Sequence, residues 1–495
     1  MKNSCLALAG LFPLSAMWAQ AQEKPNIVFI YADDYSFNSM SDIGQDHVFT
    51  PNLDELRSHG MYFSHAFNQG GWNGAISMAS RAMMVTGMYM WKAHDAVSNE
   101  EFMTQSSDED PHFWSEFMRR AGYTTYMTGK WHVFADANKL FDVVRHVREG
   151  MPPQTASGYA YRKGNPTGRK FIPGVEDSWQ PYDTSKGGYW KGGKHWSEVV
   201  ADDAVDYIDM AKQKEEPFFM YLAFNAAHDP RQAPKRNVDM YPIDNISIPR
   251  NFTPTYPYYR EMGCGEGLRD EQLAPFPRTE YSVKVNRRDY YALITHMDEQ
   301  IGRIIRALKA SGKYDNTYIM FTADHGLAVG DHGLMGKQNM YDASMRVPLI
   351  VCGPGIKKGK CDNLVYLQDV MATALDIADS EYEQKVDFKS LLPFATRDKK
   401  AAKVITRNEV YGAFRHLQRM IRTDRYKMIV YQKNHVVRLY DMKKDPFEMK
   451  DLARQPKYRK LMDELMLRFE QEQIKTGDSL DVRKAYEAFF HEEQK

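Results

Sequence analysis

Polar side chains follow four apolar segments of this sequence, each at the point where the segment ends. In chain order these residues are Asp33 with Asp34, Lys130 with His132, His228, and Asp324 with His325. Each group by itself has an ordinary explanation, such as a turn or a helix cap. Ligands of open α/β sheets bind at the carboxyl ends of the strands, so we expect the four groups to converge on one site.

Three of these side chains are carboxylates that would repel one another unless a cation lay between them. Asp33, Asp34 and Asp324 are hard oxygen donors, which suits calcium or magnesium, and calcium tolerates the larger, less regular shell. His325 offers a nitrogen atom, which a hard cation accepts less readily. The sequence therefore predicts an oxygen-rich metal site.

The stretch "ISMASRAMMVTG" (Ile76–Gly87) places Ser77 at the start of a predicted helix that stops at Gly87. Ser77 could be the helix N-cap or the reacting group of an enzyme. The positive end of a helix dipole attracts anions. We expect Ser77 to react and its neighbours to cap the helix.

Several cations accompany this helix start. The fixed ones are Arg81, Lys130 and Lys337. Histidine is the residue type that commonly titrates near neutral pH, and His132 and His228 belong to the same set. Together with a divalent ion, such a set suits an anionic substrate, either a phosphate or a sulfate ester.

The segments that must position these residues alternate between strand-like and helix-like patterns. Strands that run into polar residues are expected in "NIVFIYADD", "AGYTTYMTGKWH", "PFFMYLAFNAAHDP" and "TYIMFTADHG", and a further strand in "RVPLIVCGPG". Helices are expected at Pro51–Gly60 and Tyr290–Gly312. This alternation predicts an α/β fold with a large, mostly parallel or mixed sheet covered by helices on both faces.

Two long stretches, Glu149–Gly193 and Arg231–Thr279, break the alternation and are interpreted as walls or lids of the site. After about Ser390 the pattern of predicted elements changes. An antiparallel pair is expected at Gln418–Tyr431 and Val436–Pro446, followed by a helix from about Lys457. We therefore expect a catalytic α/β domain over residues 24–390 and a smaller α+β domain over 391–495.

The N-terminus is typical of an exported protein. Residues 1–21 read as a signal peptide, with an apolar stretch at Leu6–Trp18 and cleavage after Ala21. Export to the periplasm or the exterior is expected, without stable membrane insertion. The 65 basic and 65 acidic residues give no net charge, so the overall electrostatics do not favour binding to nucleic acid. After Cys5 is removed, three cysteines remain, so at most one bridge can form, and pairing of Cys352 with Cys361 stays open.

The chain resembles the formylglycine-dependent sulfatases of the alkaline phosphatase superfamily. Their signature of Cys or Ser, any residue, Pro or Ala, usually Ser, then Arg stands here as Ser77-Met78-Ala79-Ser80-Arg81. The likeness continues through "PNIVFIYADD", "GYTTYMTGKWH", "AAHDP", "FTADHG", "GKQNMYDASMRVPLIV" and the C-terminal tail. It implies an alkaline phosphatase-like fold and a sulfuric ester hydrolase that releases sulfate from glycans.

The resemblance also implies a role for each matching residue. Asp33, Asp34, Asp324 and His325 correspond to the ligands of one Ca²⁺ ion, His325 replacing the commoner Asn, and residue 77 also meets the metal. Ser77 corresponds to the residue oxidised to formylglycine, Arg81 and Lys130 to the groups that hold its hydrate, and His132 to the base that acts on it. His228 corresponds to the acid that protonates the leaving alcohol, and Lys337 to the lysine that binds the sulfate.

Two departures from the commonest pattern are Ser77 in place of Cys and Ala79 in place of Pro. Serine implies a serine-type radical maturase as a partner, and an engineered Cys replacement is the alternative. A plain serine would be left as a stable sulfate ester, whereas the two hydroxyls of a hydrated aldehyde split the reaction into two easier steps.

Other interpretations stay open. The chain could be a phosphodiesterase or phosphonate hydrolase of the same superfamily, or a sulfoglycan-binding protein if Ser77 is not matured. The sugar and the sulfate position are not encoded in any pattern we recognise. Trp72 and His94 flank the signature helix and are candidates for contacts with a sugar.

Overall fold

The computed structural model describes residues 23–491, apart from 149–168, 178, 185–188, 190–192 and 383. The predicted signal peptide and much of the stretch 149–193 lie outside the described residues. Among the described residues, none of the helices combines the length and apolar composition needed to cross a membrane.

The largest sheet in the described part of the chain has eight strands in the order β11-β2-β10-β8-β1-β7-β5-β6. In chain order these strands are β1 (Asn26–Ala32), β2 (Met61–Phe63), β5 (Thr124–Lys130), β6 (Val143–Arg148), β7 (Phe218–Ala223), β8 (Thr317–Ala323), β10 (Leu349–Cys352) and β11 (Gly359–Cys361). Strand β10 runs antiparallel to both β8 and β2, and the other pairings are parallel. The predicted mixed, mostly parallel sheet is confirmed.

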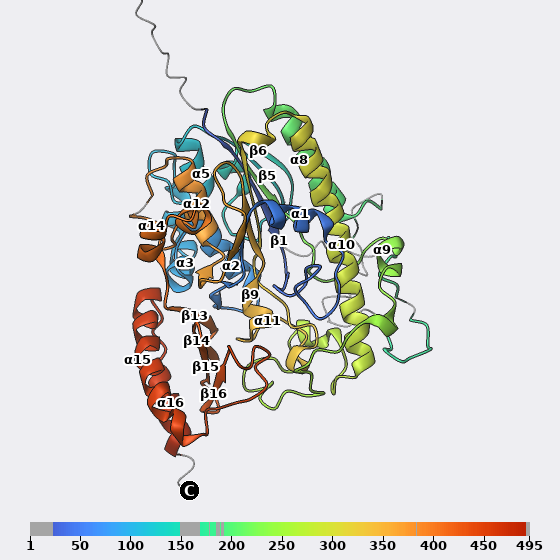
Figure 1. Cartoon of the computed structure of the whole chain (residues 1–495), viewed down its shortest axis with the longest axis vertical. Coiled ribbons are helices and arrows are strands. Elements are labelled where there is room, and N and C mark those ends of the chain that lie inside the picture. The colour runs from blue at the N-terminus through green and yellow to red at the C-terminus, as the bar shows by residue number, and fades with distance from the viewer. Residues whose placement is uncertain are drawn as a thin grey trace, which may run out of the picture.

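Helices cover both faces of this sheet, as Figure 1 shows with α2, α5 and α12 on one side and α1, α8 and α10 on the other. The helices are α1 (Pro51–His59), α2 (Ile76–Thr86), α3 (Met90–Val97), α4 (Glu100–Thr104), α5 (Trp114–Arg120), α6 (Ala137–Leu140), α8 (Trp196–Ala211), α9 (Lys235–Asp239), α10 (Glu280–Ala310), α11 (Asp342–Met345), α12 (Asp369–Ile377), α13 (Leu392–Ala395), α14 (Lys399–Ile405), α15 (Arg459–Thr476) and α16 (Val482–His491). Strand β1 is fully enclosed between the layers, which explains its continuous apolar run.

Two predicted helices differ from the structure in instructive ways. Helix α10 begins at Glu280, ten residues before the predicted start, because Thr279 and Ser282 form a capping box there. Helix α1 does end before Gly60, but Gly60 is extended rather than left-handed. A Cβ atom at Gly60 would meet the backbone oxygen of Val351 on β10, so close packing requires the glycine.

The C-terminal sheet has five strands among the described residues, in the order β16-β15-β14-β13-β4. They are β4 (Gly70–Gly71), β13 (Glu409–Phe414), β14 (Gln418–Thr423), β15 (Tyr426–Tyr431) and β16 (Val436–Asp441). The stretch predicted as one strand, Gln418–Tyr431, is a hairpin of β14 and β15. A small third sheet joins β12 (Val365–Tyr366), β3 (Ala66–Phe67) and β9 (Arg346–Val347).

Buried contacts tie the C-terminal sheet to the larger unit. Lys427 on β15 lies 2.6 Å from Glu448 and also contacts Asp342 of α11. Helices α15 and α16 lie beside the outer part of this sheet (Figure 1). The smaller α+β unit is therefore confirmed as a fold element, and its boundary near residue 390 stays a prediction.

The bridge between Cys352 and Cys361, which the sequence left open, is not formed. Cys264, Cys352 and Cys361 are all free and buried. The thiol of Cys352 donates instead to the backbone oxygen of Leu56 at 3.0 Å, and that of Cys361 lies 3.4 Å from the side-chain oxygen of Asn363.

Candidate active site

Four neighbouring strands of the large sheet, β8, β1, β7 and β5, end at one edge. Asp33 and Asp34 follow β1 directly, and Asp324 and His325 follow β8 directly. Lys130 is the last residue of β5, and His228 lies in the turn after β7. Because parallel neighbours end together, the sheet brings these side chains into one place.

The acidic residues form a compact group. One potential ligand atom from each of Asp33, Asp34, Asp324 and His325 lies within 4.8 Å of the others, and all four residues are buried. A set of three carboxylates and one imidazole fits a calcium ion better than a soft metal. The residues predicted as ligands are thus close enough to hold one ion.

Each of the three carboxylates also contacts a buried cation. The pairs are Asp33 with Lys130, Asp34 with Lys337, and Asp324 with Arg81. Burial alone would raise the pKa of Asp33, but Lys130 and its neighbouring cations hold it well below the usual value. Burial lowers the pKa of Lys130, whereas Asp34 and Asp270 raise that of Lys337 despite its burial.

These three pairs are electrically balanced before any metal binds. A divalent ion added to them would leave an excess of positive charge, which an anionic substrate would compensate. The electrostatics therefore favour the joint binding of a cation and an anionic ester.

Ser77 lies in the first turn of α2, one residue inside its start, and Ala75 occupies the N-cap position. Its side chain is 2% exposed. Its hydroxyl donates to Asp33 Oδ1 at 3.1 Å and lies 3.0 Å from His325 Nε2 and 3.3 Å from Lys130 Nζ. Ser77 is therefore not the helix cap, and its oxygen faces the candidate metal ligands Asp33 and His325.

Arg81 lies one turn further along α2 and is fully buried. Its guanidinium donates to Asp324 at 3.1 Å and to the backbone oxygen of Lys130 at 2.7 Å, and it stacks over the ring of Tyr31. It fixes the ends of β5 and β8 relative to α2.

His132 lies beside these cations in a left-handed backbone conformation, with φ of 54°. Burial, with Lys130 and Arg81 nearby, lowers its pKa to about 2. The imidazole is therefore neutral across the physiological range, and the expectation that it titrates near neutral pH is wrong.

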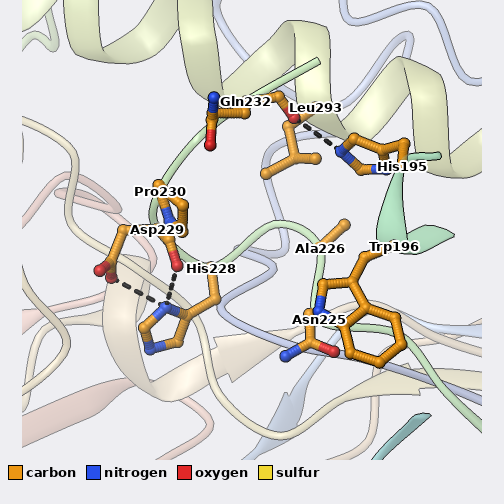
Figure 2. Close-up of a pocket in the computed structure, with 9 residues that line it drawn as sticks. All are labelled: His195, Trp196, Asn225, Ala226, His228, Asp229, Pro230, Gln232 and Leu293. Atoms are coloured by element: carbon orange, nitrogen blue, oxygen red, sulfur yellow. Dashed lines mark hydrogen bonds and ion pairs between the residues drawn. The ribbon is translucent and has the colours of Figure 1, made fainter. Parts of the chain in front are cut away.

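His228 is held by the next residue. Its Nδ1 lies 2.8 Å from the carboxylate of Asp229 and 2.9 Å from the Asp229 backbone oxygen, and Figure 2 shows both contacts beside a small cavity that Trp196 and Asn225 also line. The other nitrogen, Nε2, lies 3.9 Å from Asp34 and thus faces the group of candidate metal ligands.

A pocket of about 320 Å³ opens over Ser77. Its lining residues are Gly74, Ala75, Ser77, Lys130, His132, His228, Leu268, Arg269, Asp270, Lys337 and Gln338. Arg269, Asp270 and Gln338 were not predicted as site residues, although Arg269 and Asp270 belong to the stretch 231–279 that was interpreted as a wall of the site. No periodicity or motif marks individual residues in that stretch.

Gln338 links this pocket to the C-terminal sheet. Its amide nitrogen donates to Asp270 at 2.8 Å and to the backbone oxygen of Gly74 at 3.0 Å. Gln418 of β14 in turn donates to the backbone oxygen of Gln338 at 2.8 Å. The C-terminal sheet thus supports the loop that carries Lys337.

Trp72 and His94 lie near each other, with ring centroids 5.1 Å apart. Neither belongs to the lining of the pocket over Ser77. Their contact with a sugar stays a prediction.

Comparison with known families decides the class of this site. The model of the sulfatase family matches residues 25–380. The chain belongs to the sulfatase family. A second model, described as the C-terminal part of N-sulphoglucosamine sulphohydrolase, matches residues 330–475. The predicted family and the predicted enzyme class, a sulfuric ester hydrolase, are confirmed.

Relatives of this sulfatase cover almost the whole chain. It is 27% identical over 477 residues to an arylsulfatase of Clostridium perfringens, covering 89% of this chain and 93% of the relative. It is 25% identical over 548 residues to an N-acetylglucosamine-6-O-sulfatase of Bacteroides thetaiotaomicron, covering 96% and 91%. A protein solved with its substrate D-glucosamine-2-N,6-O-disulfate shares the fold, with a TM-score of 0.70, 22% identity and coverage of 93% and 99%.

Proposed function

We propose that this sulfatase releases inorganic sulfate from O-sulfated saccharides, using one calcium ion and a formylglycine made from Ser77. The observation that carries the proposal is the position of the Ser77 hydroxyl. It lies within 3.3 Å of Asp33, His325 and Lys130, at the floor of an open pocket.

Asp33, Asp34, Asp324 and His325 would hold the calcium ion, with residue 77 beside it. The bound ion would supply positive charge that polarises the sulfate ester. Lys337 and Lys130 line the same pocket and would bind the remaining sulfate oxygens.

Formylglycine would supply a hydrated aldehyde, whose paired hydroxyls allow sulfate to be released where a plain serine ester would persist. Arg81 would hold the end of β5 in place against α2, and Lys130 would stabilise negative charge on residue 77. His132, which burial and then the surrounding cations keep neutral, would accept a proton from that residue.

His228 would donate a proton to the departing sugar oxygen. Its Nε2 faces the candidate metal ligands, and the carboxylate of Asp229 contacts the other ring nitrogen, Nδ1. General acid help matters most for a poor leaving group, and a sugar alkoxide is one.

A saccharide substrate is supported by the relatives. One is named for N-acetylglucosamine-6-O-sulfatase activity, and a structural neighbour was solved with a sulfated glucosamine. The proposal also includes export, directed by a signal peptide at residues 1–21. A serine-type maturase would be the partner that converts Ser77.

The test compares protein made with and without a serine-type maturase. Conversion of Ser77 to the aldehyde should lower the mass of its peptide by about two hydrogens, because an alcohol is oxidised. The matured protein should hydrolyse members of a panel of monosulfated glucosamine, N-acetylglucosamine, galactose and N-acetylgalactosamine.

Ser77→Ala, made beside the same maturase, is the matched control. Equal turnover by matured and unmatured protein would contradict the role of formylglycine. Binding of sulfated sugars without turnover by fully matured protein would instead support a non-catalytic binding protein.

A further inference from the structure

Arg269 differs from the other cations that line the pocket in being accessible to solvent. Its side chain is 30% exposed, whereas those of Lys130 and Lys337 are 2% and 3% exposed. Arg269 lies in the long stretch 231–279, immediately before the short turn of helix at Asp270–Leu273. It therefore borders the entrance of the pocket rather than its floor.

The guanidinium of Arg269 lies between two carboxylates. It donates to Asp270 Oδ1 through Nε at 2.8 Å and through a terminal nitrogen at 2.5 Å. The same terminal nitrogen lies 3.2 Å from Asp229 Oδ1 and 3.3 Å from His228 Nε2. Both carboxylates have pKa values well below the usual range, because Arg269 and nearby cations outweigh the effect of burial.

The contact with His228 places Arg269 on the leaving-group side of the reaction. In the proposed function, His228 Nε2 gives its proton to the sugar oxygen that departs. A guanidinium next to that nitrogen must therefore adjoin the sugar rather than the sulfate. A bound sugar would replace His228 Nε2 as an acceptor for Arg269.

The charges around Arg269 decide which sugar substituent fits. A second sulfate or a carboxylate would meet Asp229 and Asp270 together with the arginine, and the two acids would repel it. A hydroxyl group can accept from the guanidinium and donate to Asp270, which also lines the pocket. Asp270 Oδ2 accepts from Gln338 at 2.8 Å, and a carboxylate oxygen can accept a second hydrogen bond.

We propose that Arg269 and Asp270 together form a hydroxyl-recognition pair that selects a free hydroxyl of the sugar close to the sulfated position. The pair discriminates against saccharides that carry a second anionic group at that position. This inference rests on the proposed function, because it assumes that His228 faces the leaving oxygen.

The test combines enzyme variants with matched substrates. The probes are the best monosulfated monosaccharide of the panel, its deoxy analogues at each neighbouring hydroxyl, its disulfated analogues, and 4-nitrophenyl sulfate. The wild type should prefer the monosulfate over one deoxy analogue by roughly 10- to 100-fold in kcat/KM, the range for a hydrogen bond to a charged group. Arg269→Ala should remove most of this preference, with a larger loss on the monosulfate than on the deoxy analogue or on 4-nitrophenyl sulfate.

Arg260→Ala is the control, because Arg260 lies in the same stretch, is 66% exposed and pairs with Glu266 away from the pocket. It should keep the full preference. Equal losses for Arg269→Ala on all substrates would overturn the proposal, because the arginine would then only position His228. A wild type that favours the disulfated analogue would overturn it as well.

Binding separates this inference from the proposed function. Calorimetry with unmatured protein, calcium and the same sugars should show the preference for the hydroxyl and its loss in Arg269→Ala. Matured protein that hydrolyses no sulfate ester would contradict the proposed function, whereas equal binding of the monosulfate and all its deoxy analogues would contradict the hydroxyl-recognition pair.

Discussion

The Nδ1 atom of His228 lies 2.8 Å from the carboxylate of its own neighbour, Asp229. An imidazole that donates Nδ1–H to a carboxylate presents Nε2 as the nitrogen that exchanges protons. Asp229 stays ionised in this environment, since Arg269 and His228 hold its pKa well below the usual value although burial opposes this. The pair thus fixes the orientation of the ring, and the ionised Asp229 would stabilise the imidazolium form, which carries on Nε2 the proton that the proposed acid must give.

Replacing His228 should affect substrates according to their leaving groups. His228→Ala should slow a saccharide sulfate by roughly 10²–10⁴-fold and an activated aryl sulfate much less, because a sugar alkoxide needs the proton more. Steady-state kinetics on both esters checks this. His132→Ala, the comparison variant, should slow both esters alike, and equal losses in His228→Ala would contradict its assignment as the acid.

Replacing Asp229 should weaken the same step indirectly. Asp229→Asn should lower kcat for the saccharide ester by roughly 10- to 100-fold, as expected when a positioning partner of histidine is lost. The loss should largely disappear in the His228→Ala background, because the two residues act together. Asp239→Asn on α9, where Asp239 pairs with exposed Lys235, is the control. Additive losses in the double variant would show that Asp229 acts elsewhere.

The sequence predicted the floor of the site well because parallel strands impose it. The stretches "NIVFIYADD" and "TYIMFTADHG" were both predicted to be strands that end in acids. They form the neighbouring parallel strands β1 and β8, so Asp33 and Asp324 lie close together. Ser77 does lie inside the helix and not at its N-cap, but Ala75, which occupies that position, makes no side-chain cap bond, so the expected capping by neighbours is not seen.

The walls of the site could not be predicted in the same way. Arg269 reaches the pocket through an irregular stretch, where no hydrophobic period constrains the path. Strand β4 was missed because two glycines, Gly70 and Gly71, carry no side-chain pattern, and their pairing with β13 depends on distant residues. Whether Cys352 and Cys361 pair was left open because sequence spacing does not determine geometry, and both are free in the structure.

Calcium should stabilise the folded protein through the acidic group. A ligand at 100 times its Kd adds about 2.7 kcal/mol to the free energy of unfolding, so calcium should raise the Tm of wild type. Asp34→Asn should remove most of this shift. Asp315→Asn, in the turn before β8, should keep it. A shift retained in full by Asp34→Asn, measured by calorimetry with and without a chelator, would place the ion elsewhere.

A separate prediction concerns the folded scaffold at α1. Thr50 makes no side-chain cap bond there. Instead, Asp298 of α10 accepts hydrogen bonds from the backbone nitrogens of Asn52 at 3.0 Å and Leu53 at 2.8 Å. Burial is the main cause that raises the pKa of Asp298 to about 6.

This raised pKa fixes the sign of a pH effect on stability. The unfolded carboxyl ionises near its model value of 3.8, whereas the folded one holds its proton to about 6. The stabilising contribution is therefore fully present below the unfolded pKa and is lost as the pH rises through the folded pKa. Relative to Asp298→Asn, the unfolding free energy of wild type should fall by about 2 kcal/mol between about pH 4.5 and pH 7.5.

Denaturant unfolding of both proteins at the two pH values measures this difference. Asp298→Asn should itself be destabilised at about pH 4.5 by roughly 1–3 kcal/mol, since an amide cannot accept all the hydrogen bonds that the carboxyl group accepts. Asp209→Asn, an exposed change on α8, should shift neither quantity. A wild-type curve that runs parallel to that of Asp298→Asn would mean that Asp298 titrates alike in both states. The cap of α1 would then depend on the geometry of its acceptors and not on their charge.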